Sequence, residues 1–162
     1  MFRSRVLWSL VPITAALVLA LALPAPLVAH CQIPCGIFGD EARFVEMLED
    51  VQTIEKSMNE INRLSGESKP NWNQLVRWVN NKEDHADKLT ETVTYYFLAQ
   101  RIKPPKDDDA AAAEKYIHEL KLLHGMMVHA MKAKQTTDTA HCESLRELIG
   151  KLKTSYLGEH KH

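Results

Sequence analysis

The sequence predicts an all-α protein, an up-and-down four-helix bundle that follows an apolar leader and a short cysteine-containing segment. Along four stretches, apolar residues recur in alternating steps of three and four, which places them on one face of a helix. Proline, glycine, threonine and aspartate separate these stretches, so the connections are short. No stretch shows the alternation of a strand over a useful length. These three observations favour helices packed around one core.

The first helix is predicted from an apolar stripe that begins at Phe44, and Gly66 and Pro70 are expected to end it. Its polar side carries Glu49, Asp50, Gln52, Glu55, Lys56 and Asn59, which we expect to face water. Its apolar side, expected to face the core, consists of Phe44, Met47, Val51, Ile54, Met58 and Ile61.

The second helix is predicted to begin at about Asn71 and to end before Pro104 and Pro105. A polar stretch, residues 80–87, interrupts its apolar face. That stretch is either a contact with another subunit or a support for a functional site, or it is a solvated face that crosses the stripe. The residues expected on the inward side are Trp72, Leu75, Val76, Val79, Ala86, Leu89, Val93, Tyr96 and Phe97.

The third and fourth helices are separated by residues 136–138, and residues 107–109 supply acidic caps to the third. Three histidines of the third helix, at positions 118, 124 and 129, lack the spacing of a metal-binding pair, so we expect them at or near the surface. The third stripe is Ala113, Tyr116, Ile117, Leu120, Leu123, Met127 and Met131. The fourth is Cys142, Leu145, Ile149, Leu152 and Tyr156, which makes Cys142 a small core residue.

Residues 1–29 have the pattern of an export signal. Arg3 and Arg5 form a basic start, an apolar run follows from residue 6 to 23, and Ala29 precedes the expected cut. The alternative is a retained membrane anchor, because about 20 apolar residues can span a bilayer. The predicted division is therefore a leader over 1–29, a short segment over 30–38 and a helical domain over 39–162.

A cut after Ala29 would expose the sequence His-Cys-Gln-Ile-Pro-Cys-Gly, residues 30–36, as a new chain end. That end combines a free α-amine, an imidazole, a backbone amide and two thiols four residues apart. Such a set could bind one transition metal ion. The alternative is a disulfide between Cys31 and Cys35, as expected of cysteines in an oxidising compartment.

This sequence resembles the nickel hook of nickel-dependent superoxide dismutases, and residues 36–58 and 73–86 are similar to the first two helices of the cyanobacterial-type branch. The resemblance implies an enzyme that converts superoxide to oxygen and hydrogen peroxide with a nickel ion cycling between Ni(III) and Ni(II). It also implies a homohexamer and a maturation or signal peptidase. After cleavage the protein would be periplasmic or extracellular, or cytoplasmic if the leader is only a pro-segment.

The resemblance further implies the nickel ligands and their surroundings. The ligands would be the α-amine and imidazole of His30, the amide nitrogen and thiolate of Cys31, and the thiolate of Cys35. Thiolates and a deprotonated amide would bring the nickel potential into the range that superoxide requires, and divalent nickel favours square-planar sites. Residues expected to shape or support the hook are Pro34, Gly36, Phe38, Glu46 and His85. Phe38 stands where the family often has tyrosine, and His85 stands where another branch has arginine. Glu46 would orient the imidazole.

The charge balance limits other functions. Without Arg3 and Arg5, 18 of the 20 basic residues remain against 21 acidic ones, a net charge of about -3. This composition argues against nucleic acid as a partner. A membrane would be contacted only through an uncleaved leader. Two alternatives stay open. Glu46 could equally be an ordinary solvated residue. The whole chain could be a non-enzymatic metal-binding or trafficking protein.

Overall fold

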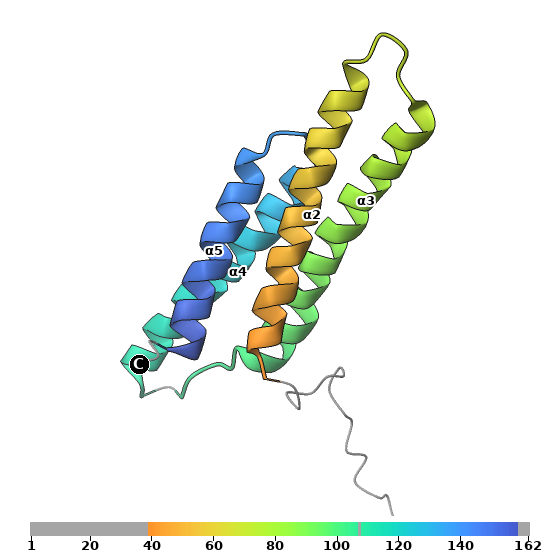
Figure 1. Ribbon diagram of the computed structural model, residues 1–162. Helices are drawn as coiled ribbons and strands as arrows, with labels where there is room; N and C mark the ends of the chain where they lie inside the picture. The colour runs from red at the N-terminus through yellow and green to blue at the C-terminus, as the bar shows by residue number, and fades with distance from the viewer. Residues whose placement is uncertain (1–38, 107, 159–162) are drawn as a thin grey trace, which may run out of the picture. The chain divides into compact units, whose positions relative to one another are not determined.

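Four helical segments run alternately up and down in the computed structural model, which describes residues 39–106 and 108–158 (Figure 1). They are α2 (Glu41–Ser65), α3 (Trp72–Glu91) with its π-helical continuation η1 (Thr92–Arg101), α4 (Ala110–Gln135) and α5 (Ala140–Leu157). The most extensive contacts join α2 to α3 and α4 to α5, and further contacts join α2 to α5 and α3 to α4. The described ranges contain no strand. The predicted all-α bundle is confirmed.

Local chemistry explains where these helices begin and end. The side chain of Asn71 accepts a hydrogen bond from the Gln74 amide, 3.2 Å away, at the start of α3. Asp109 accepts one from the Ala112 amide at 2.9 Å and starts α4 as predicted. The α2 helix ends before Gly66. The boundaries therefore follow signals that are visible in the sequence.

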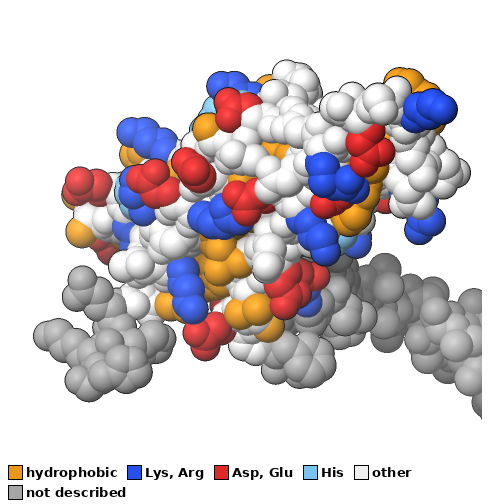
Figure 2. Space-filling view, turned by 45° about the horizontal axis from the view of Figure 1, so that its top comes forward, with side chains coloured by type: hydrophobic (Ala, Val, Ile, Leu, Met, Phe, Trp, Pro, Cys, Tyr) orange, Lys and Arg blue, Asp and Glu red, His pale blue; other side chains and the backbone are white. Residues whose placement is uncertain are grey.

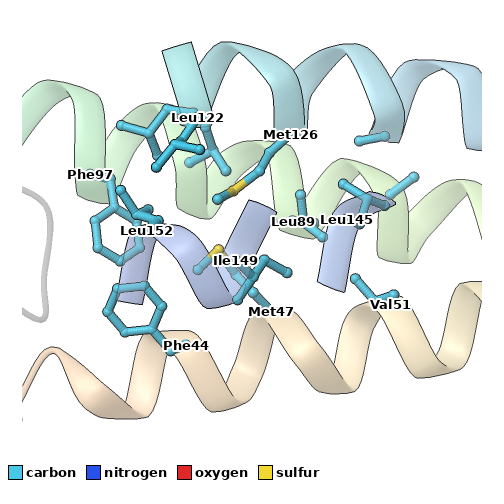
Figure 3. Close-up of a cluster of buried hydrophobic side chains, with 14 of the residues drawn as sticks. Phe44, Met47, Val51, Leu89, Phe97, Leu122, Met126, Leu145, Ile149 and Leu152 are labelled. Atoms are coloured by element: carbon cyan, nitrogen blue, oxygen red, sulfur yellow. The ribbon is translucent and has the colours of Figure 1, made fainter. Parts of the chain in front are cut away.

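The core lies along the axis of the bundle and draws on all four helices (Figure 3). At one end, the Phe44 ring of α2 packs against Phe97 of η1 with 5.1 Å between ring centroids. Tyr156 of α5 lies 5.7 Å from the Phe97 ring. Each fully buried large apolar side chain stabilises the fold by about 1.5–3 kcal/mol relative to an exposed one. The first and fourth predicted stripes are confirmed, with Tyr156 partly buried at the edge.

Two residues predicted to face the core from the second helix are instead exposed. Trp72 retains 68% of its accessible surface and Val76 55%. In Figure 1 the hairpin formed by α2 and α3 extends beyond the connection between α4 and α5. Helix α2 packs against α3, but it leaves Trp72 and Val76 exposed.

The third predicted stripe is confirmed only in part. Ile117 and Met131 are exposed, whereas Leu122 and Met126 are buried. Helix α4 is apolar on more than one side, and periodicity does not decide between two such faces. The buried side contains small residues and one acid, Glu119, whose Oε1 accepts a hydrogen bond from Ser155 at 2.9 Å. The members of the predicted stripe that pack against the core are Leu123 and, in part, Tyr116, Leu120 and Met127.

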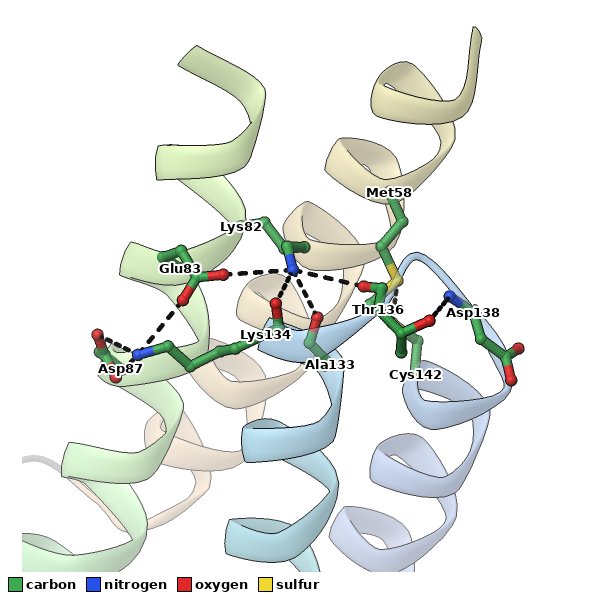
Figure 4. A network of polar contacts seen from close by, with 9 residues as sticks. All are labelled: Met58, Lys82, Glu83, Asp87, Ala133, Lys134, Thr136, Asp138 and Cys142. Carbon is green, nitrogen blue, oxygen red and sulfur yellow. Dashed lines mark hydrogen bonds and ion pairs between the residues drawn. The ribbon is translucent and has the colours of Figure 1, made fainter. Parts of the chain in front are cut away.

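The polar interruption of the second helix, residues 80–87, makes contacts within this chain (Figure 4). Lys82 is only 4% exposed and donates to the carbonyl oxygens of Ala133, at 2.8 Å, and Lys134, at the end of α4. Asn81 donates to Ser57 of α2 at 2.9 Å. Lys82 therefore does not belong to a solvated face. It neutralises the negative end of a neighbouring helix.

The surface carries mixed charge. On the face drawn in Figure 2, Lys and Arg side chains are interspersed with Asp and Glu. In the described part of the chain, no helix is long and apolar enough to cross a membrane.

Candidate metal centre

The predicted metal ligands precede the bundle in the chain. His30, Cys31 and Cys35 lie outside the described residues, as do Pro34, Gly36 and Phe38. Between residues 39 and 158, leaving out residue 107, no three or more His, Cys, Asp or Glu side chains form a group that could hold a metal ion. The described bundle thus offers no competing site with three or more such ligands. Amine, amide and thiolate donors at residues 30–35 suit nickel chemically.

Cys142 is a free thiol in the core, as the sequence predicts. Its Sγ lies 3.8 Å from the Met58 sulfur. Burial raises the pKa of this thiol to about 11, so it stays protonated at neutral pH. A disulfide from Cys142 to either Cys31 or Cys35 would require the core to open.

Asp40, two residues after the predicted hook, is the centre of a polar cluster at the start of α2. Its Oδ2 accepts a hydrogen bond from the Tyr156 hydroxyl at 2.6 Å. Its Oδ1 accepts from the Tyr96 hydroxyl and from the Arg101 guanidinium, the latter at 2.6 Å. The same guanidinium also donates to the Tyr96 oxygen at 3.3 Å. We call Asp40, Tyr96, Arg101 and Tyr156 the Asp40 cluster.

The cluster keeps Asp40 ionised. Burial by itself would raise the pKa of this carboxyl, but the hydrogen bonds from Tyr156, Tyr96 and Arg101 outweigh it, and the pKa lies below the ordinary value. Burial, followed by the bond to Asp40, raises the pKa of Tyr156. Both hydroxyls of the cluster therefore remain donors at neutral pH. The cluster could not be predicted from the sequence, because its members are far apart in the chain.

Glu46 is placed on α2 with its side chain 49% exposed. Its Oε2 lies 2.5 Å from an Arg43 guanidinium nitrogen, three residues earlier. Arg43 in turn lies over the Tyr96 ring, 5.3 Å from its centroid. The Glu46 carboxylate is thus accessible and already has one cationic partner. Its predicted role toward His30 stays a prediction.

His85 makes a contact that was not predicted. Its Nδ1 lies 2.7 Å from Oδ1 of Asp50, which is only 5% exposed. We expected Asp50 on the solvated side of its helix, and that prediction is wrong, since the carboxyl faces α3. Burial raises the pKa of Asp50, and the bond and charge of His85 partly offset this effect. The second oxygen of Asp50 is buried without a hydrogen-bond partner.

A second histidine contact joins α4 to α5. The Nδ1 atoms of His129 and His141 lie 3.3 Å apart. Burial, with the charges of His141 and Lys132, lowers the pKa of His129. His118 and His124 are exposed, as predicted. Spacing along the sequence could not reveal the pair, because His141 belongs to another helix.

Comparison with known proteins identifies one family. The model of the nickel-containing superoxide dismutase family matches residues 25–161, which is most of the chain. No curated protein and no solved structure matches.

Proposed function

This chain belongs to the nickel-containing superoxide dismutase family, and from that premise we propose that its nickel is bound by residues 30–35 after removal of residues 1–29. The family makes the protein an oxidoreductase that contains nickel and acts on superoxide. Matching residues begin at 25, so the matched region includes the whole predicted hook. That match is the single observation that carries the proposal.

Cleavage before His30 creates a ligand that the precursor lacks. In an uncut chain the nitrogen of His30 is part of a peptide bond, and its lone pair is delocalised and unable to bind a metal. Once freed, the amine can join the amide nitrogen of Cys31 and the thiolates of Cys31 and Cys35. Binding releases protons from the thiols and the amide, so nickel affinity falls at low pH.

The bound nickel would supply the one-electron couple, between Ni(III) and Ni(II), that dismutation requires. The chain's own residues hold and shape the site. Pro34 would bend the backbone so that Cys35 could return toward the amine, and Gly36 would relieve crowding where the chain turns away. Phe38 would border the metal site, but it has no hydroxyl to donate to a bound anion. Glu46 would orient the His30 imidazole through a hydrogen bond.

The leader directs the protein out of the cytoplasm in this proposal. A basic start, an apolar run and a final alanine are the features of an export signal. The product would be periplasmic or extracellular. Recovery of the mature protein from the cytoplasm would instead identify residues 1–29 as a pro-segment with a dedicated peptidase.

The mature enzyme would be a homohexamer. In support, several apolar side chains of the α2 and α3 pair are exposed: Val45, Leu48, Trp72 and Val76. Contacts between subunits would remove these groups from water and could hold each hook in place.

Two recombinant chains that differ by one residue test the proposal. One begins at His30 and the other at Ala29, and both are reduced and loaded with nickel. We expect superoxide consumption by the first chain, its loss on removal of nickel, and little activity from the second. Mass spectrometry of the native protein should give an N-terminus at His30.

Several outcomes would contradict the proposal. Equal activity of the two chains would exclude the amine as a ligand. Nickel bound tightly without turnover would indicate a metal carrier. A native chain that keeps its leader, or a Cys31 to Cys35 disulfide in the active enzyme, would exclude this hook.

A further inference from the structure

The carboxylate of Asp40 does not perform the usual function of its position. Asp40 precedes the first residue of α2, where an aspartate side chain commonly accepts from a helix amide. Here it makes no such hydrogen bond. Both of its oxygens are instead used by side chains that are 56, 61 and 116 residues away in the chain. Side-chain hydrogen bonds therefore connect the start of α2 to η1 and α5, which lie far away in the sequence.

The irregular helix η1 presents two of these partners together. Tyr96 and Arg101 are five residues apart, and η1 has the i to i+5 bonding of a π-helix, which continues at its end with the Ile102 amide donating to Phe97 at 2.9 Å. In a regular α-helix, residues five apart point about 140° away from one another. The π-helical winding thus lets both side chains reach one carboxylate.

Tyr156, the third partner of Asp40, connects the cluster to the hydrophobic core. Tyr156 is near the end of α5, and its ring lies 5.7 Å from Phe97 and 6.2 Å from Phe44. Phe44 and Phe97 are fully buried. Because close-packed cores have few alternative arrangements, the Tyr156 hydroxyl is held in place by the packing of its own ring.

The cluster lies within short reach of the hook along the chain. Asp40 is five positions after Cys35 in the chain, and an extended chain spans at most about 3.6 Å per residue. The Cys35 sulfur ligand therefore originates within roughly 18 Å of the Asp40 backbone. A fixed anchor at this point restricts the volume that the free hook can explore.

We propose that Asp40 is a positioning residue: held by Tyr96, Arg101 and Tyr156, it fixes the point from which the nickel hook leaves the bundle and so preorganises the metal-free hook. This inference rests on the proposed function of residues 30–35. Rigidifying a binding segment increases affinity because less freedom is lost on binding. Supporting residues of this kind typically affect metal affinity by about 10- to 100-fold.

Three variants of the chain that begins at His30 test the proposal. Tyr156→Phe removes one hydrogen bond and keeps the packed ring, Asp40→Asn removes the charge, and Tyr95→Phe is the control. Tyr95 is adjacent to Tyr96 on η1, but its side chain is exposed. Nickel affinity is measured by competition with a chelator, and the amide hydrogen exchange of the first turn of α2 is measured without metal.

We expect Tyr156→Phe and Asp40→Asn to weaken nickel binding by about ten-fold or more and to speed exchange in the first turn of α2. The control should match the parent in both measurements. The paramagnetic resonance spectrum of the oxidised, nickel-loaded enzyme should broaden in the first two variants, because the hook adopts a wider range of geometries. Circular dichroism and thermal unfolding establish that each variant is folded.

The result that overturns the proposal is a folded Tyr156→Phe protein with parental nickel affinity, spectrum and exchange. Should Asp40→Asn fail to fold, the Tyr156→Phe result decides alone. Equal weakening by Tyr95→Phe would also refute a specific role of the cluster. Failure of the proposed function is a different observation, because the parent itself would then lack nickel-dependent turnover.

Discussion

Asp40 and Asp50 lie on one helix, yet their pKa values shift in opposite directions. Both are partly withdrawn from water, and burial alone raises the pKa of each. Three donors outweigh this effect at Asp40. At Asp50, His85 is the one hydrogen-bonding partner among the described residues, and none of them bonds to the second, buried oxygen. The number of donors around each carboxyl therefore decides the direction in which its pKa shifts, which neighbouring sequence does not reveal.

Selective alkylation tests the assignment of the three cysteines. In reduced, metal-free protein at pH 8, we expect iodoacetamide to modify Cys31 and Cys35 and to leave Cys142 unmodified until the protein unfolds. The reason is that the thiolate reacts, whereas burial raises the pKa of Cys142 to about 11. Peptide mass spectrometry gives the extent at each site. Modification of Cys142 at the rate of the other two would contradict its burial.

The lowered pKa of His129 predicts acid sensitivity of the contact between α4 and α5. An unfolded histidine titrates near 6.5, and the folded value is lower. Between the two values the unfolded state binds more protons, so the free energy of unfolding falls as the pH drops below about 6.5. We expect His129→Gln to reduce this dependence, measured by thermal unfolding from pH 7.5 to 5.5. His124→Gln, an exposed change on the same helix, should retain it, and identical profiles for both variants would disprove the assignment.

At the scale of helices, the Lys82 side chain of α3 caps the C-terminal end of α4. Its ammonium lies at the carbonyl end of α4, where it contacts Ala133, Lys134 and Thr136, while Glu83 lies 3.3 Å from the same nitrogen (Figure 4). Lys134 extends the network by pairing with Asp87 at 2.7 Å. The polar stretch within α3 thus stabilises the end of a neighbouring helix.

Replacing Lys82 by methionine should destabilise the protein by about 1–3 kcal/mol, since buried carbonyl groups would lose a charged donor. The hydrophobic stem is largely preserved, so the change isolates the ammonium. Denaturant unfolding measures the effect, and Lys121→Met, at an exposed position of α4, is the control. Equal stability of the two variants would show that water replaces the ammonium without cost.

At the scale of the whole molecule, the exposed apolar end of the α2 and α3 hairpin predicts association. We expect the processed, nickel-loaded protein to sediment as a hexamer. A charge in a contact between subunits is costly to bury, so Val76→Asp should shift the protein toward smaller species without loss of helix content. Sedimentation velocity and circular dichroism make this comparison. A monomeric parent, or unchanged mass in both Val76→Asp and Trp72→Asp, would refute the predicted contact.

Local pattern was sufficient for some features and insufficient for others. Asn71, Gly66 and Asp109 mark helix boundaries because capping and termination depend on neighbouring residues. The buried face of α4 was predicted only in part, because Ile117 and Leu122 are both plausible core residues and only the position of the other helices selects one. The same holds for Asp50, whose partner is on another helix.

The hook is the clearest case of information carried by sequence alone. A leader followed by His30, Cys31 and Cys35 predicts the donors and the need for cleavage, because these residues are close together in the chain. Their arrangement in space lies outside the described residues.

By itself, the sequence determined the helical class and most helix boundaries and predicted a set of nickel donors, since each depends on residues close together in the chain. The tertiary structure alone decided which face of α4 is buried, that Trp72 and Val76 of α3 are exposed, and that Asp40 is held by Tyr96, Arg101 and Tyr156. These features depend on how helices pack, and the contacts at Asp40 join residues at least 56 positions apart. The apolar periodicity within one helix does not predict contacts between residues of different helices.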